Sequence, residues 1–106
     1  MRKGAVVLVP FPFTDLSGAK VRPALVLALS RGEDCTLAFV SSVQKRRGAY
    51  DMVVKCSRMN GLKADSVIKL DKIATLQRSL VLGSIGGLEA NYMAQVDTKL
   101  KTFFRL

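Results

Sequence analysis

The side chains that this sequence offers for chemistry are few in kind, and the most versatile kind is missing. The chain contains no histidine and no tryptophan. Histidine is the commonest general acid and base in enzymes, and its absence also excludes the Ser-His-Asp and Cys-His triads and most zinc sites. There is also no GxxxxGK[ST] loop that could cradle a nucleotide phosphate. What remains is arginine, lysine, serine, threonine and a few carboxylates.

Those remaining groups suit the chemistry of a phosphodiester. Cationic and hydroxyl side chains can bind a phosphate, orient a ribose hydroxyl and stabilise the negative charge of a pentacovalent phosphorus. RNA supplies its own nucleophile, the 2′-OH. We therefore expect a site that uses no metal and no cofactor.

Arg22 lies at the end of an unusually long polar segment between two apolar runs. Residues 10–23 separate the apolar runs 6–9 and 24–29. Hairpin connections usually take roughly two to five residues, and long ordered loops often carry function. We expect Arg22 to be a cation held at the base of a strand. The alternative is that Arg22 only caps this strand and pairs with Asp71.

The charge balance favours a polyanionic partner. The chain has 17 Lys and Arg against 8 Asp and Glu, a net charge of +9. Such an excess on a small domain is typical of nucleic-acid binding, although it is also compatible with plain solubility or an acidic protein partner. A membrane-binding helix is disfavoured because the cations lie among strand and turn signals. In the basic turn 44–48, we expect Lys45, Arg46 and Arg47 to contact phosphate and Gln44 to contact a base edge.

Apolar runs and alternation predict a mainly β chain. The expected strands are residues 6–9, 24–29, 35–43, 51–56 and 66–70, with a sixth apolar run at 80–83. Residues 71–79 are compatible with a strand or a turn. Only the tail has helical spacing, with apolar residues at Leu88, Tyr92, Val96, Leu100 and Phe103 or Phe104. We expect roughly five to seven short strands, forming a strongly bent sheet or partly open barrel with a C-terminal helix. The helix stripe is expected to be core.

One domain over residues 1–106 is expected, in the cytoplasm. No apolar run approaches the roughly 18 residues that span a bilayer, and the run 6–9 is too short for a signal peptide. Cys35 and Cys56 form no CxxC pair. We interpret both as strand or core thiols.

Three sequence blocks resemble the PemK/MazF family of toxins of type II toxin–antitoxin systems. The most specific block is GAVVLVPFPFTDLSGAKVRPALVL at residues 4–27. The other two are AFVSS at 38–42 and GLKADSVIKLDKIATL at 61–76. The blocks occur in the family's order, and the resemblance extends from Lys3 into the C-terminal helix.

The resemblance implies a fold and an activity. Family members adopt an SH3-like barrel with appended helices and usually form homodimers. They cleave single-stranded RNA at short sequence motifs without a metal, and many leave a cyclic phosphate and a 5′-hydroxyl. A cognate antitoxin blocks the substrate groove with an extended acidic tail.

The resemblance also implies roles for individual residues. Arg22 corresponds to the catalytic arginine, which would hold the scissile phosphate and stabilise its developing charge. Ser41 stands where the family has a catalytic Thr or Ser, and Ser42 is the alternative, one residue away. The residues expected to bind substrate are Phe13, Thr14, Asp15, Lys20, Gln44, Lys45, Arg46 and Arg47. One of Phe11 and Phe13 should be core, and the other could stack on a base.

Two departures from the family pattern concern acidic residues. The family often has an acidic residue after the first glycine, where this chain has Ala5, and the loop before Arg22 offers only Asp15. The general base is therefore Asp15, or it is absent and water deprotonates the 2′-OH. Two other functions stay open: an RNA-binding barrel without catalysis, and a CcdB-like toxin that acts on a protein.

Overall fold

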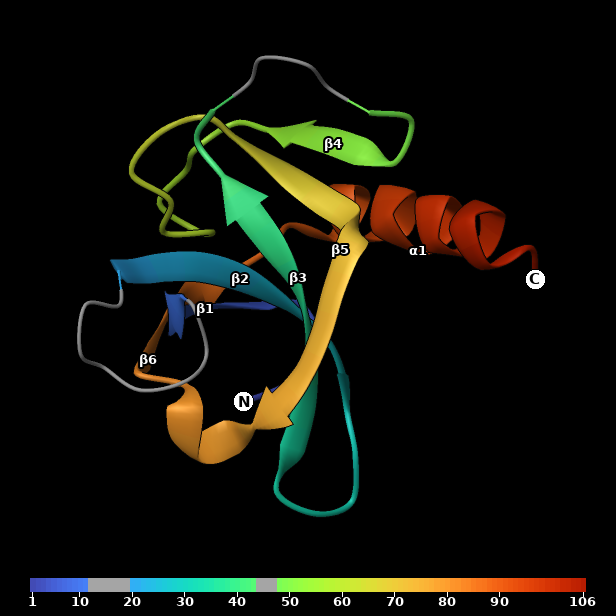
Figure 1. The fold of residues 1–106 in the computed structure, drawn as a ribbon. Helices are drawn as coiled ribbons and strands as arrows, with labels where there is room; N and C mark the ends of the chain where they lie inside the picture. The colour runs from blue at the N-terminus through green and yellow to red at the C-terminus, as the bar shows by residue number, and fades with distance from the viewer. Residues whose placement is uncertain (12–19, 44–47) are drawn as a thin grey trace.

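The computed structural model describes residues 1–11, 20–43 and 48–106. In these residues the chain forms one antiparallel sheet, a short 3-10 turn and a C-terminal helix (Figure 1). The elements are β1 Ala5–Phe11, β2 Lys20–Leu29, β3 Asp34–Ser41, β4 Asp51–Val54, β5 Ser66–Gln77, η1 Arg78–Leu80, β6 Gly83–Gly87 and α1 Ala90–Phe104. The strand order is β4-β5-β3-β2-β1-β6. This curled, partly open sheet with one helix confirms the predicted fold class.

The continuous apolar runs of β1 and β2 are explained by burial on both faces of the sheet. Alternate residues of β1 enter different cores, so that Val6 packs with Leu25 while Val7 packs with Val26. The first core also receives Val96 of α1. Because successive side chains of a strand point to opposite faces, a strand covered on both sides needs apolar residues at every position.

β5 is the element that the sequence described least well. The ambiguous residues 71–79 continue the strand as far as Gln77. The β3–β5 register shifts between Ala38 and Phe39, which pair with Ile73 and Lys69. The additional residues of β5 form a bulge, and bulges bend a strand and increase its twist. Figure 1 shows β5 bending sharply along its length.

The sixth apolar run, at 80–83, does not form a strand of its own. Leu80 ends the 3-10 turn, and β6 occupies Gly83–Gly87 instead. Within this strand Gly86 has to be glycine, because a Cβ at that position would overlap the Met59 carbonyl oxygen. The backbone of residues 59–61 therefore packs directly on β6, where side chains would not fit.

The helix stripe is core, as expected, along most of its length. Val96 is fully buried, and Tyr92 and Leu100 pack against the same core. Phe103 is half-buried against Tyr50, with ring centroids 4.9 Å apart, whereas Phe104 is exposed. No helix within residues 1–11, 20–43 and 48–106 is long and apolar enough to cross a membrane.

The two cysteines are free thiols in different environments. Cys35 is buried in β3, as predicted, and this burial raises the pKa of its thiol. Cys56 is exposed beyond the end of β4, so its prediction as a strand or core thiol is wrong. A hydrogen bond with the Asp65 carboxylate raises the pKa of the Cys56 thiol.

Asn60 ties the segment between β4 and β5 to the start of α1. Its side chain is completely buried and uses both its oxygen and its amide group. The oxygen accepts from the backbone N–H of Ser57 at 3.1 Å and of Leu62 at 3.0 Å. The amide donates to the Lys55 carbonyl at 2.9 Å and to Glu89 at 3.1 Å. Since Glu89 is the N-cap residue of α1, Asn60 connects three parts of the fold.

Replacing Asn60 with alanine should destabilise the protein by about 3 kcal/mol, because several buried polar groups would lose their partner at once. The exposed Asn91→Ala variant should stay within about 0.5 kcal/mol of the wild type. Urea unfolding followed by circular dichroism measures both. Equal stabilities of the two variants would contradict the assigned role of Asn60.

Candidate active site

Arg22 lies inside β2, not at the end of a loop. β2 begins at Lys20, and Arg22 pairs with Val9 of β1. The bounds predicted for the polar segment, 10–23, are wrong at both ends, because β1 runs to Phe11 and β2 begins at Lys20. On its other side β2 pairs with β3 through Ala24 and Phe39. If this antiparallel register is extended by two residues, Arg22 stands level with Ser41.

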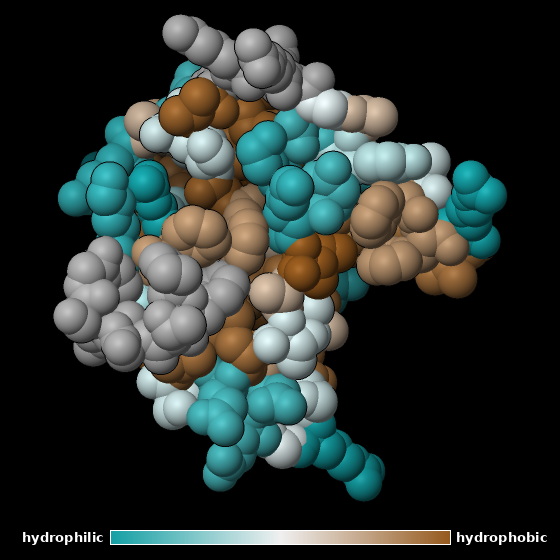
Figure 2. Space-filling view, in the orientation of Figure 1, coloured by the Kyte–Doolittle hydropathy of each residue, from teal (hydrophilic) through white to brown (hydrophobic). Residues whose placement is uncertain are grey.

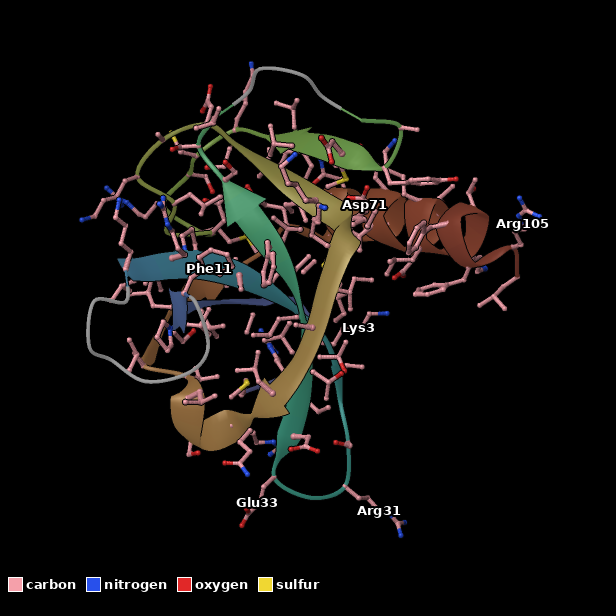
Figure 3. The ribbon with its side chains drawn as sticks, in the orientation of Figure 1. Lys3, Phe11, Arg31, Glu33, Asp71 and Arg105 are labelled. Carbon is pink, nitrogen blue, oxygen red and sulfur yellow. The ribbon has the colours of Figure 1, made fainter. Side chains whose placement is uncertain are left out.

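A first hollow of about 460 Å³, the aromatic hollow, opens beside Arg22. It is lined by Val9, Phe11, Arg22, Pro23, Phe39, Val40, Ser41, Val43, Lys69 and Lys72. The rings of Phe11 and Phe39 meet edge to face with centroids 5.5 Å apart. Figure 3 shows Phe11 beside β2 and β3, and Figure 2 shows apolar surface over this region, bounded by hydrophilic residues.

A second hollow of about 440 Å³, the loop hollow, also includes Arg22. It is lined by Leu8, Val21, Arg22, Pro23, Val40, Ser42, Gly61, Leu62, Lys63, Ala64, Ser66 and Ile85. The segment between β4 and β5 contributes Gly61 to Ala64. Arg22 therefore stands between two hollows, each of a size typical of small-ligand sites.

The two candidate serines line different hollows. Ser41 lines the aromatic hollow and Ser42 the loop hollow, as expected for neighbouring residues at the end of a strand. The Ser41 hydroxyl oxygen accepts a hydrogen bond from the Val43 backbone N–H at 3.1 Å. This bond orients the hydroxyl and leaves its proton available for donation to a ligand.

The cations of the aromatic hollow differ in their charge compensation. Lys69 forms an ion pair with Asp51 at 3.0 Å, and the Asp51 side chain is only 3% exposed. Asp51 also accepts a hydrogen bond from the Gly48 backbone N–H at 2.8 Å. The ion pairs within the described residues are Lys3–Asp97 and Lys69–Asp51, so Arg22 and Lys72 are not paired with a described carboxylate.

Sequence reasoning missed Lys69, Lys72 and Lys63. Lys69 and Lys72 reach one hollow because the β5 bulge falls between them, and no pattern in the sequence specifies that bulge. Lys63 enters the site through the segment between β4 and β5, far from Arg22 in sequence. The available signals were the excess of positive charge and the position of all three lysines in the block 61–76.

Several predicted site residues lie outside the described part of the chain. These are Phe13, Thr14, Asp15, Gln44, Lys45, Arg46 and Arg47. Lys20 is described; it is exposed at the start of β2 and lines neither hollow. The alternative pair of Arg22 with Asp71 is not formed, and Figure 3 shows Asp71 where β5 bends.

The described residues of the site contain donors but no carboxylate. No Asp or Glu of the described residues lines either hollow, and no three His, Cys, Asp or Glu side chains of residues 1–11, 20–43 and 48–106 gather as a metal site. Arg22 offers a planar fork of N–H donors, and Ser41 adds a hydroxyl. This set can hold one phosphodiester and stabilise extra negative charge on it.

The fold occurs in solved structures of toxins. A mycobacterial endoribonuclease in complex with its cognate antitoxin superposes with a TM-score of 0.79 at 16% identity, covering 100% of this chain and 96% of that one. MazE-MazF (Form-III) from Deinococcus radiodurans gives 0.78 at 23% identity, covering 100% and 97%. The Mycobacterium tuberculosis toxin MazF-mt6 gives 0.77 at 22% identity, covering 96% and 97%. At these identities the likeness shows a shared fold.

Membership of a family is shown by the sequence itself. No curated protein sequence matches the chain significantly. The sequence model of one family, however, matches residues 2–104, nearly the whole length. The chain belongs to the family of PemK-like, MazF-like toxins of type II toxin–antitoxin systems.

Proposed function

We propose that this protein is a toxin that cleaves single-stranded RNA at specific sequences, without a metal, by attack of the 2′-OH on the adjacent phosphate. The observation that carries the proposal is the position of Arg22. Its exposed side chain has no described carboxylate partner, and Arg22 lines both hollows, with Ser41 lining the aromatic hollow beside it. The family and the mycobacterial endoribonuclease of the same fold support this activity.

Arg22 and Ser41 act on the same phosphate. The guanidinium binds the non-bridging oxygens and stabilises the second negative charge that develops in the pentacovalent transition state. The Ser41 hydroxyl donates a further hydrogen bond to one of these oxygens. The 2′-oxygen forms a bond to phosphorus, the bond from phosphorus to the 5′-oxygen breaks, and the products are a cyclic phosphate and a 5′-hydroxyl.

The proton inventory requires a base and an acid. The 2′-OH loses its proton to Asp15 or to water, and the leaving 5′-oxygen gains a proton from solvent. Asp15 lies outside the described residues. Phe13, Thr14, Lys20 and the basic turn 44–47 complete the proposed RNA-binding surface, with Lys72 as an addition from the aromatic hollow.

The proposed partners follow from the same charge distribution. An acidic antitoxin would place carboxylates on Arg22 and the neighbouring cations, because the net charge is +9. Solved structures of the same fold include an endoribonuclease with its cognate antitoxin and a MazE-MazF complex. We further propose a homodimer that works in the cytoplasm.

A catalytically inactive RNA-binding protein is the second candidate. It is favoured by one observation, that no carboxylate of the described residues lines either hollow. RNA binding without cleavage would support it. A CcdB-like action on a protein target would instead give activity that does not depend on RNA.

Arg22→Ala should reduce the rate of RNA cleavage in EDTA by at least about 100-fold, because the transition-state charge loses its main donor. Arg22→Lys should recover only part of this loss, since an ammonium group lacks the guanidinium fork. Arg31→Ala, at the tip of the β2–β3 hairpin in Figure 3, is the matched control and should cleave normally. Wild-type cleavage by a folded Arg22→Ala protein would refute the assignment.

Ser41→Ala and Ser42→Ala should separate the two candidate serines. Loss of the Ser41 hydroxyl should lower the cleavage rate roughly tenfold to 100-fold, and loss of the Ser42 hydroxyl less than about threefold. Single-turnover cleavage of one RNA measures both variants under identical conditions. If Ser42→Ala gives the larger loss, the catalytic hydroxyl belongs to the loop hollow.

Lys72→Ala should make RNA binding less sensitive to salt. Each phosphate contact on a single strand contributes about 0.7 to the slope of log K against log salt concentration, so the slope should fall by about that amount. Fluorescence anisotropy with a labelled, non-cleavable oligonucleotide gives the slope. Lys101→Ala on α1 is the control. An equal change of the slope in both variants would show that Lys72 does not contact the RNA.

A further inference from the structure

The position of Arg22 between two hollows has a consequence for how an RNA strand would lie. A scissile phosphate has a nucleotide on each side, and the Arg22 fork can hold only one phosphate in its plane. Arg22 lines both hollows, and the neighbouring residues Ser41 and Ser42 line one hollow each, so a strand held at Arg22 can reach both hollows. The nucleotide on one side of the scissile phosphate would lie in the aromatic hollow.

The loop hollow has the chemistry of a site for a nucleobase. Leu8, Val40 and Ile85 contribute apolar walls, and the cations that line it are Arg22 and Lys63. A base has apolar faces and a polar edge, so apolar walls with a few polar groups match it. Ser66 is occupied internally, because its hydroxyl donates to the Ala64 carbonyl at 2.8 Å. Lys63 therefore supplies the free donor from this side.

The segment that carries Lys63 is held rigidly. Gly61 has φ +72°, and a Cβ there would overlap the Ile85 carbonyl oxygen. The backbone N–H of Gly87 donates to the Met59 carbonyl at 2.9 Å, and the Asn60 side chain fixes the same turn. A hollow whose wall is fixed before binding loses little entropy when a ligand enters.

We infer that the loop hollow binds the base of the nucleotide on one side of the scissile phosphate, opposite the nucleotide in the aromatic hollow, and that Lys63 determines specificity there. This inference rests on the proposed function. An RNA occupant is favoured over an acidic peptide because the hollow shares Arg22 with the proposed cleavage site and its walls are apolar. An acidic peptide would need several cations along its path.

The inference is tested by combining substitutions in the protein with changes in the RNA and measuring whether their effects on binding are coupled. The probe is a short RNA made non-cleavable by one 2′-deoxy nucleotide at the cut position, with a series of single abasic positions on either side. Binding is measured for the wild type, Lys63→Ala, Lys72→Ala and, as control, Lys101→Ala. Lys63→Ala should weaken binding of the intact RNA about tenfold.

The abasic series locates Lys63. The Lys63→Ala loss should disappear when the base on one side of the cut is absent, and persist when the base on the other side is absent. The Lys72→Ala loss should persist at every abasic position, because Lys72 is proposed to contact a phosphate. The inference is overturned if Lys63→Ala couples to no base, couples to bases on both sides of the cut, or behaves like Lys101→Ala.

The same measurement separates this inference from the proposed function. Binding does not require catalysis, so a protein that never cuts the intact all-RNA strand would contradict the proposed function, while the abasic series would still show whether the Lys63→Ala loss couples to one particular base. If a hexaglutamate peptide binds in the hollow and the affinity for RNA is the same with and without Lys63, the hollow is a site for an acidic peptide. This result would overturn the inference.

Discussion

The site depends on the antiparallel pairing of β2 with a neighbour on each side. β1 fixes Arg22 opposite Val9, and β3 fixes Ala24 opposite Phe39. A shift by one residue would reverse every side chain of β2 between the two faces of the sheet. Burial of Leu25 and Val26 in different cores prevents that shift. The hydrophobic pattern of β2 thus sets the direction of a cation that contributes nothing to the core.

The distribution of charge partners separates structural cations from those available to a ligand. Lys69 is held by a nearly buried Asp51, which also binds the backbone at Gly48 where the chain enters β4. Arg22, Lys72 and Lys63 have no ion pair with a described carboxylate. Uncompensated cations beside apolar walls are unfavourable for a protein alone and favourable once a polyanion binds.

Local patterns predicted most of the strands and made Arg22 a candidate residue, because apolar runs and turn signals act over a few neighbouring residues. They could not predict the β5 bulge, which depends on pairing with β3 and carries Lys72 into the aromatic hollow. The position of β6 was missed because Gly86 is required there by close packing on residues 59 and 60, a contact between distant segments. Lys63 and the loop hollow were missed for the same reason, and Cys56 because β4 ends earlier than its apolar run suggested.

The proposed nucleophile, the 2′-OH, belongs to the RNA and not to the protein. Replacing it therefore tests the central claim most directly. The measurement is cleavage, in EDTA, of two RNAs that differ only by a 2′-deoxy nucleotide at the cut position. Cleavage of the all-RNA strand and none at the 2′-deoxy position, with binding retained, is the predicted result. Equal cleavage of both strands would contradict attack by the 2′-OH.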